Sequence, residues 1–236
     1  MILEFRSVTK LLQRKPILEE MSFCQPSNVS IGVLGARGSG KTTLINLVLG
    51  ATDPERGRIC RQGRLSMPIG FPAMLNRFLT GEENARFLAG LYGLEARSVC
   101  AFVEEFSELG PILRQPLSSY NSTRRSRFHF ALSYAIPADC YVADGVIFGG
   151  DSGFRDKCLA MAKAKRREAA FFFTTHSPRD MRLFADVGAV IQNRRLVFYP
   201  SVEAAIAAFG PGEDIAVAAD AEPMANESEG DLSIDI

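Results

Sequence analysis

One segment constrains this chain more than any other: Gly35-Ala36-Arg37-Gly38-Ser39-Gly40-Lys41-Thr42-Thr43. It fits the pattern G-x-x-x-x-G-K-[ST] of phosphate-binding loops without a mismatch. The apolar, β-branched residues 29–34 before it predict a buried strand, and residues 43–50 after it predict a helix that ends on a glycine. Strand, loop and helix occur in the order that the motif requires, which argues against a chance glycine-rich turn.

The residue types of this phosphate loop suit a bound anion. Its glycines let several backbone N–H groups converge on one phosphate, and the following helix adds the positive end of its dipole. We expect Lys41 to reach the β- and γ-phosphates and the Thr42 hydroxyl to ligate Mg²⁺. The loop therefore predicts a site for a nucleoside triphosphate with magnesium.

Bulk composition predicts a soluble globular chain. The 236 residues suffice for one large domain, or one domain with a subdomain. No apolar run approaches the roughly 18 residues of a membrane helix, and the charged N-terminus does not resemble a signal peptide. Five scattered cysteines without a C-x-x-C pair indicate free thiols rather than a disulfide framework or a zinc site. We expect a cytoplasmic chain whose membrane role depends on a partner.

The zero net charge hides an acidic C-terminus. Of the 27 acidic residues, eight lie within residues 212–236, which contain no Lys or Arg. The remaining 19 acids face 27 basic residues, so the body of the chain carries a charge of +8. Residues 211–236 are predicted to be a disordered solubilising tail, or an acidic arm that docks on a basic surface. The charge of the body is too dispersed to indicate nucleic acid.

Strands and helices alternate along residues 1–210, except in a helical insertion at about 79–135. This pattern predicts an α/β fold with a ligand at the carboxyl ends of its strands. Thr80 and Glu83 form a capping-box pattern that marks the start of the insertion. The predicted strands are residues 2–8, 17–24, 29–34, 58–60, 64–67, 139–144, 169–175, 187–192 and 196–199, and the predicted helices are residues 43–50, 84–91, 96–108, 122–135, 155–165, 178–184 and 202–209.

Two further strand ends carry polar side chains. An apolar strand closes on Asp144, about a hundred residues after the loop, where a carboxylate can support Mg²⁺; a structural cap is the alternative. The strand at residues 169–175 precedes His176, whose imidazole can hydrogen-bond a γ-phosphate; the alternative is an ordinary surface histidine. His129, inside a predicted helix, receives no role.

These three strand ends, with the helical insertion between the first and second, resemble an ATP-binding cassette (ABC) ATPase. The segments 66–70, 79–84 and 102–110 narrow the likeness to ATPase subunits of capsular-polysaccharide exporters. Residues 120–128 and 154–158 continue it, so that it covers residues 1 to about 210. It implies a phosphate-loop nucleotide-binding domain with a mainly parallel core sheet, an antiparallel β subdomain and an inserted helical subdomain.

The resemblance also implies a mechanism. Two such subunits enclose two ATP molecules head to tail at the cytoplasmic face of the inner membrane, and two permease subunits move an acidic glycan outward. Lys41, Thr42, Asp144 and His176 match the family and inherit its roles, and Asp151 falls in the loop that meets the opposite subunit. The second ATPase subunit can be an identical or a different chain.

Several positions depart from the family pattern. Gly145 stands where the family has the glutamate that orients or deprotonates water. Ser122 remains in the signature that contacts the second ATP, but Thr123 puts a β-branched side chain where glycine allows close approach. Asn76 replaces the glutamine that links Mg²⁺ to the permease, and no aromatic residue occurs near residues 11–12 to stack on adenine.

Three functions remain in competition. The first is an exporter ATPase subunit that binds Mg-ATP, hydrolyses it slowly because Gly145 lacks a base, and works with a partner. The second is a catalytically silent nucleotide-binding subunit with a regulatory or scaffold role. The third is a small-molecule kinase, which explains neither the helical insertion nor His176.

Overall fold

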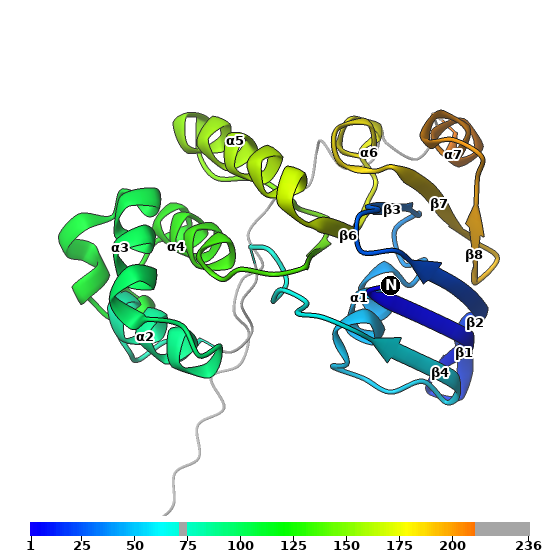
Figure 1. The fold of residues 1–236 in the computed structure, drawn as a ribbon, viewed down its shortest axis with the longest axis horizontal. Coiled ribbons are helices and arrows are strands. Elements are labelled where there is room, and N and C mark those ends of the chain that lie inside the picture. The colour runs from blue at the N-terminus through cyan, green and yellow to red at the C-terminus, as the bar shows by residue number, and fades with distance from the viewer. Residues whose placement is uncertain (71–74, 211–236) are drawn as a thin grey trace, which may run out of the picture.

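A computed structural model describes residues 1–70 and 75–210 of the chain. Figure 1 shows two sheets on one side of the molecule and a group of helices on the other, with α5, α6 and α7 along one edge. The acidic tail at residues 211–236 lies outside the described residues, so its two interpretations stay as they were.

The larger sheet has five strands in the order β5-β6-β3-β7-β8. The first four are parallel, and β8 pairs antiparallel with β7. Every residue of β3 and β6 is buried, as expected for a parallel sheet covered on both faces. The predicted α/β class is therefore confirmed. The strand bounds are β3 Ile31–Leu34, β5 Cys140–Asp144, β6 Ala170–Thr175, β7 Val187–Gln192 and β8 Arg195–Phe198.

The smaller sheet is antiparallel, with β1 (Leu3–Leu12) between β2 (Lys15–Gln25) and β4 (Arg56–Arg61). Gln13 and Arg14 have φ values of 51° and 66°, so a two-residue left-handed turn joins β1 to β2. Helix α1 (Lys41–Leu49) buries four apolar side chains in a core shared by both sheets. This core fixes the helix that begins at the phosphate loop.

The helical insertion comprises three α-helices and two short 3₁₀ turns. Thr80 and Glu83 form the expected capping box at the start of α2. Figure 1 shows this group on the opposite side of the molecule from β1, β2 and β4. Its apolar faces join a second core with one face of the parallel sheet. The bounds are α2 Gly81–Leu91, α3 Ala96–Ser107, η1 Gly110–Arg114, η2 Leu117–Ser119 and α4 Ser122–Ala135.

The last three helices each begin at a side chain that caps the helix. The capping residues are Asp151, Ser177 and Ser201, each of which accepts a backbone N–H three residues on. Helix α5 (Ser152–Glu168) begins three residues before the predicted start because Asp151 caps it. Helices α6 (Pro178–Phe184) and α7 (Val202–Phe209) have the predicted bounds.

The strand predicted at residues 64–67 is wrong. Only an isolated parallel bridge joins Leu65 to Cys140, although the segment follows the edge of β5. The Ser66 hydroxyl accepts the N–H of Val142 at 2.9 Å, where a carbonyl would continue a ladder. Pro68 follows and has no N–H to donate. Hydrogen bonding through a side chain therefore interrupts the strand.

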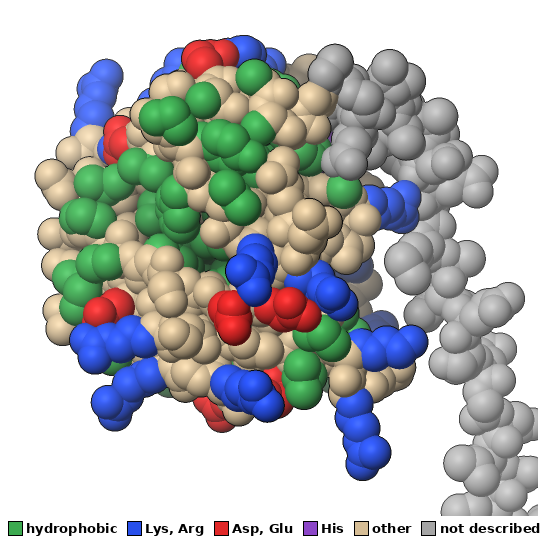
Figure 2. All heavy atoms as spheres, turned by 90° about the vertical axis from the view of Figure 1, so that its right-hand side faces the viewer, with side chains coloured by type: hydrophobic (Ala, Val, Ile, Leu, Met, Phe, Trp, Pro, Cys, Tyr) green, Lys and Arg blue, Asp and Glu red, His purple; other side chains and the backbone are tan. Residues whose placement is uncertain are grey.

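The surface is mixed in character. Figure 2 shows one face on which Lys and Arg side chains are scattered, with acidic side chains among them. Within residues 1–70 and 75–210, no helix combines the length and the apolar character needed to span a membrane.

Candidate nucleotide site

The phosphate loop turns sharply between β3 and α1. Gly38 and Gly40 have φ values of 80° and 100°, the left-handed region that glycine tolerates best. A Cβ on Gly40 would lie 3.0 Å from Cγ2 of Ile17, so the loop is also pressed close to β2. The Ser39 N–H donates to the Ala36 carbonyl at 3.1 Å, which closes the turn. Glycine is therefore favoured at both positions by the backbone conformation, and at Gly40 also by the close approach of β2.

The Lys41 side chain folds back over the loop. Its Nζ donates to the carbonyls of Gly35 and Ala36, each at 2.6 Å. The ammonium group therefore lies at the centre of the loop, where it can meet a phosphate. Ser39 Oγ is buried and has no hydrogen-bond partner among the described residues. Arg37 is exposed.

Asp144 joins the loop to two other strands. The Thr42 hydroxyl donates to Oδ2 of Asp144 at 2.6 Å, and the Thr174 hydroxyl donates to Oδ1 at 2.7 Å. A hydroxyl beside a carboxylate is an all-oxygen donor set, which suits Mg²⁺ completed by phosphate oxygens and water. No cluster of three His, Cys, Asp or Glu ligands occurs in the part of the chain that the structure describes. The residues fit a cation held jointly by protein and nucleotide.

His176 follows directly after β6. In the sheet register Thr175 pairs with Leu34, the last residue before the loop, and Thr174 pairs with Asp144. His176 therefore leaves the same edge of the sheet as the loop and the aspartate, and it is exposed there. Burial raises the pKa of Asp180, four residues on, and the charge of His176 is among the weaker effects that lower it. The structure thus places the three predicted strand ends at one edge.

The residue after Asp144 has no side chain and an unusual backbone. Gly145 has a φ of 78°, and its N–H donates to the Thr174 carbonyl at 2.9 Å. A Cβ built there meets no atom within 4 Å. Space for a larger side chain is present, but an L-residue must adopt a left-handed conformation to use it.

Comparison with known proteins agrees with this geometry. A model of the ABC transporter family matches residues 18–92, which include the phosphate loop. The capsule polysaccharide export ATP-binding protein CtrD of Neisseria meningitidis is 37% identical over 81% of this chain and 88% of its own length. This chain belongs to the ABC transporter family. The polysialic acid transport ATP-binding protein KpsT of Escherichia coli is 33% identical over 86% of this chain and 92% of its own length.

Two solved structures support the ABC ATPase fold. The ATP-binding subunit of an ABC transporter superposes with a TM-score of 0.72 at 19% identity, covering 83% of this chain and 88% of its own. An ATP-binding cassette solved as a dimer bound to ADP and Pi superposes with a TM-score of 0.70 at 15% identity, covering 83% of this chain and 96% of its own. This chain is thus an ATP-binding subunit of the ABC type, and a small-molecule kinase is not supported.

The segment predicted to be the signature, residues 120–124, lies at the start of α4. The side chain of Asn121 caps the helix by accepting the Arg124 N–H at 2.9 Å, and Ser122 and Thr123 are exposed in the first turn. Tyr120 is buried, and its hydroxyl donates to the Ile112 carbonyl at 2.8 Å. This hydrogen bond fixes the segment to η1. Hydroxyls and backbone N–H groups are therefore presented outward at a helix start.

Asp151 is held within its own chain. Arg127 of α4 donates to both carboxylate oxygens, at 2.8 and 2.9 Å, and to Glu108 at 3.0 Å. The Arg127 hydrogen bonds are the main reason that the pKa of Asp151 falls from 3.8 to about 2. Lys157 of α5 pairs with the same Glu108 at 2.8 Å. This network connects α3, α4 and α5.

The Asn76 side chain is engaged locally. The side-chain Oδ1 of Asn76 accepts the Phe78 N–H at 2.9 Å, and the backbone N–H of Asn76 donates to Asn84 Oδ1 at 2.9 Å. The amide oxygen therefore forms a turn before α2, and no described contact joins it to Thr42 or Asp144. A role beside Mg²⁺ stays a prediction for this residue.

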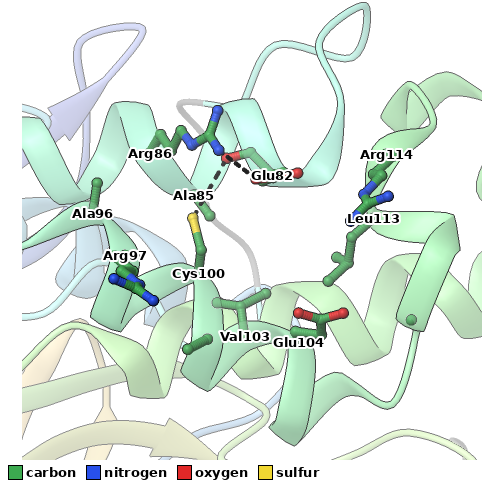
Figure 3. A pocket seen from close by; sticks show the side chains of 12 residues that line it. Glu82, Ala85, Arg86, Ala96, Arg97, Cys100, Val103, Glu104, Leu113 and Arg114 are labelled. Atoms are coloured by element: carbon green, nitrogen blue, oxygen red, sulfur yellow. Dashed lines mark hydrogen bonds and ion pairs between the residues drawn. The ribbon is translucent and has the colours of Figure 1, made fainter.

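A separate cavity of about 630 Å³ lies between α2, α3 and η1, away from the loop. Figure 3 shows Glu82 paired with Arg86 on one wall, with Cys100 below them. Arg97 and Arg114 stand on other walls. The cavity belongs to the helical insertion and has no counterpart in the predicted site.

Two contributors to the site region were not predicted. Thr174 gives Asp144 its second hydrogen bond; the signal was available, because a threonine pair ends the apolar run of β6. Arg127 falls within a segment that resembles the family but carries no predicted role, and its partners lie 19 and 24 residues away in the chain. Local patterning gives no sign of such a pairing.

Proposed function

We propose that this ABC subunit binds Mg-ATP and drives the export of a capsular or related polysaccharide across the inner membrane. The observation that carries the proposal is the Thr42–Asp144–Thr174 arrangement beside an intact phosphate loop. The names of the relatives support the glycan class, since they include capsule polysaccharide, polysialic acid and teichoic acid export. The proposed organisation is a nucleotide-binding domain at residues 1–210 with its helical insertion at about 79–135.

The residues of the loop bind and orient the nucleotide. Loop N–H groups and the Lys41 ammonium donate to phosphate oxygens, which replace the carbonyl contacts of Lys41 in part. Thr42 and Asp144 would hold Mg²⁺, which would supply positive charge beside the phosphates. His176 donates a hydrogen bond toward the γ-phosphate from the end of β6.

Hydrolysis by the isolated chain is proposed to be slow. Gly145 provides no carboxylate, and a missing general base reduces a rate by about 10²–10⁴-fold. The left-handed backbone at this position supports the view that the chain is adapted to glycine there. The alternative is a silent regulatory or scaffold subunit, which Gly145 and Thr123 favour and which the intact Thr42–Asp144 pair does not.

Phosphate release measured with purified protein and Mg-ATP tests whether the isolated chain hydrolyses ATP slowly. We expect binding of the nucleotide with turnover well below about 1 s⁻¹, near the low end of enzyme rates. Faster turnover by the chain alone would contradict slow hydrolysis. If a second ATPase subunit restores turnover, the exporter function is supported. If no pairing of subunits gives turnover, the silent subunit is supported.

A second ATPase subunit is the proposed partner at the signature segment. Ser122 and Thr123 present hydroxyls and helix N–H groups outward, as needed to contact a nucleotide held by another chain. The family resemblance places Asp151 in the loop that meets the opposite subunit. Sedimentation of the purified chain with and without Mg-ATP, alone and mixed with a complete ATPase, tests whether the pair is homomeric or heteromeric.

Permease subunits are proposed to contact the helical insertion, which would place the chain at the cytoplasmic face of the membrane. Phe78, Phe87 and Leu91 are 75%, 55% and 57% exposed on or just before α2, and Phe87 and Leu91 share one helix face. An apolar patch of this kind fits the apolar face of a cytoplasmic permease helix. Co-purification of the Phe87→Ser and Leu91→Ser variants with the permease tests the contact. We expect both substitutions to reduce the amount of permease recovered.

A further inference from the structure

The cavity of about 630 Å³ in the helical insertion has the size of a small-molecule site. Such sites typically measure roughly 300–1,000 Å³. Its walls come from α2, α3 and η1, so the whole cavity lies within one subdomain (Figure 3). The buried side chains of Ala85, Val103 and Leu113 line it and form an aliphatic floor. The cavity can therefore accept the apolar face of a ligand.

The three walls are held in fixed positions. The Thr80–Glu83 capping box fixes the start of α2, and the Glu95 side chain caps α3. A Cβ on Gly81 would lie 3.0 Å from Cδ2 of Leu113, so η1 packs closely against the start of α2. The walls therefore form one preorganised unit, and a ligand does not have to order them.

One wall carries charges that are already paired. Arg86 forms an ion pair with Glu82, one turn before it on α2. Cys100 of α3 adds a weak contact, since its Sγ lies 3.9 Å from the Glu82 carbonyl oxygen. Figure 3 shows these side chains close together. Because the groups satisfy one another, we assign them to the structure of the wall.

Two other arginines that line the cavity lack such partners. Arg97 lies in the first turn of α3, and Arg114 ends η1. Within residues 1–70 and 75–210, neither guanidinium has an ion pair, a hydrogen bond or a ring contact. Figure 3 shows the two side chains on opposite sides of the cavity. The cavity therefore presents one available guanidinium at each end.

Glu104 adds a negative group on the wall between them (Figure 3). Its side chain is exposed, and its carboxylate has no hydrogen bond or ion pair with any residue that the structure describes. A guanidinium binds phosphate or carboxylate oxygens, whereas a carboxylate accepts hydrogen bonds and repels a nearby anion. A ligand that suits this cavity therefore has an anionic group at each end and hydroxyl donors between them.

We propose that this cavity binds a phosphorylated acidic sugar, with Arg97 and Arg114 holding its phosphate and carboxylate and Glu104 accepting hydrogen bonds from its hydroxyls. The C–H groups of the sugar ring cover the aliphatic floor. Sugars of this class are units of acidic glycans, so the choice of a sugar among dianionic ligands rests on the proposed function. The cavity and its charges do not depend on nucleotide binding.

Calorimetric titration of the full chain with glucuronic acid 1-phosphate tests the assignment. Glucose 1-phosphate lacks the carboxylate and glucuronate lacks the phosphate, so each can engage only one guanidinium. We expect saturable binding of the acidic sugar phosphate, at least about tenfold tighter than that of either other ligand. No binding of this ligand, or equal affinity for all three, would overturn the proposal.

Substitutions at the two ends of the cavity separate the two anionic contacts. We expect Arg97→Gln and Arg114→Gln each to weaken the acidic sugar phosphate at least about tenfold, and each to abolish its advantage over one of the two single-anion ligands. Arg77→Gln is the matched control, because Arg77 is also exposed near the start of α2 but is not among the described lining residues. Ala101→Leu adds volume at a lining position without changing charge, and it should weaken all three ligands.

Glu104→Gln distinguishes hydrogen bonding from repulsion. The amide still accepts a hydrogen bond but has no charge, so we expect the acidic sugar phosphate to bind about two- to fivefold more weakly. Tighter binding would show that the carboxylate repels the ligand, and the hydroxyl contact would then be wrong.

Lys41→Ala locates the bound ligand. We expect this variant to bind the acidic sugar phosphate like the wild type, so a failure of nucleotide binding would leave this result standing. If Lys41→Ala loses the ligand while Arg97→Gln and Arg114→Gln keep it, the sugar phosphate occupies the phosphate loop and the proposal is wrong. If Arg77→Gln weakens binding as much as Arg97→Gln, the general loss of positive charge is the cause, and the proposal is also wrong.

Discussion

The Thr42 hydroxyl donates a 2.6 Å hydrogen bond to Oδ2 of Asp144, 102 residues away in the chain. One partner begins the helix after the phosphate loop, and the other ends a strand two places along the sheet. Thr174 on the intervening strand holds the second carboxylate oxygen. Three segments are thus fixed around one oxygen-lined point, and the chemistry of the site depends on this geometry.

Replacing Asp144 by Asn tests the metal role. The amide keeps the size of the side chain and can accept the Thr42 hydrogen bond, but it removes the charge that attracts Mg²⁺. We expect wild-type ATP affinity to be at least about tenfold higher in Mg²⁺ than in EDTA, and this ratio to approach one in Asp144→Asn. Thr174→Val, which removes only an orienting hydroxyl, should lose a smaller part of the ratio. Calorimetry measures both. An unchanged ratio in Asp144→Asn would place the metal elsewhere.

Gly145→Glu tests whether the remaining catalytic machinery is intact. A glutamate finds space there but must adopt a φ near 78°, which costs about 1 kcal/mol of stability. Gly145→Gln carries the same strain without a base. We expect phosphate release at least about tenfold faster in the Glu variant than in the Gln variant. Equal rates at equal stability would mean that other parts of the site also limit hydrolysis.

The Arg127–Asp151 pair predicts an acid-sensitive contribution to stability. Because the pKa of Asp151 is lowered from 3.8 to about 2, the stabilisation is present above pH 4 and is lost as the pH falls toward 2. Asp151→Asn keeps the cap of α5 but removes the charge. The difference in thermal midpoint between wild type and variant should shrink between pH 4 and 2. A difference that stays constant over this range would show that the charge does not stabilise the fold.

His129 predicts a second pH effect, in a different range. Burial lowers its pKa from 6.5 to about 4, so the native chain binds fewer protons than the unfolded chain between those values. Stability is therefore full above pH 6.5 and falls as the pH drops toward 4, by about 2 kcal/mol between pH 7 and 5. Urea unfolding of wild type and His129→Gln at both pH values measures it. A loss of the same size in the variant would exclude His129 as the cause.

Element boundaries were predictable where a side chain marks them. Thr80 with Glu83 signals the start of α2, Pro178 that of α6, and Gly50 the end of α1. The strand expected at residues 64–67 failed because the Ser66 hydroxyl takes the place of a backbone acceptor. Apolar periodicity alone carries no information about such an exchange.

The site was predictable to the extent that strand ends share an edge. The parallel order of the strands brings the segments that carry Lys41, Asp144 and His176 to one edge, and Thr42 follows Lys41 directly. The roles of these residues toward a nucleotide stay predictions. The contacts of Asn76 and Arg127 were not predictable, because each depends on how the helical insertion packs.

Calorimetric titration of the full chain with Mg-ATP, beside Lys41→Ala and Arg37→Ala, tests the central claim most directly. Lys41 folds over the loop, whereas Arg37 of the same loop is exposed, so the second variant is a matched control for loss of charge. We predict saturable binding to wild type and Arg37→Ala, and binding weakened at least about 100-fold in Lys41→Ala. No heat of binding with the wild type, or equal binding by all three proteins, would contradict it.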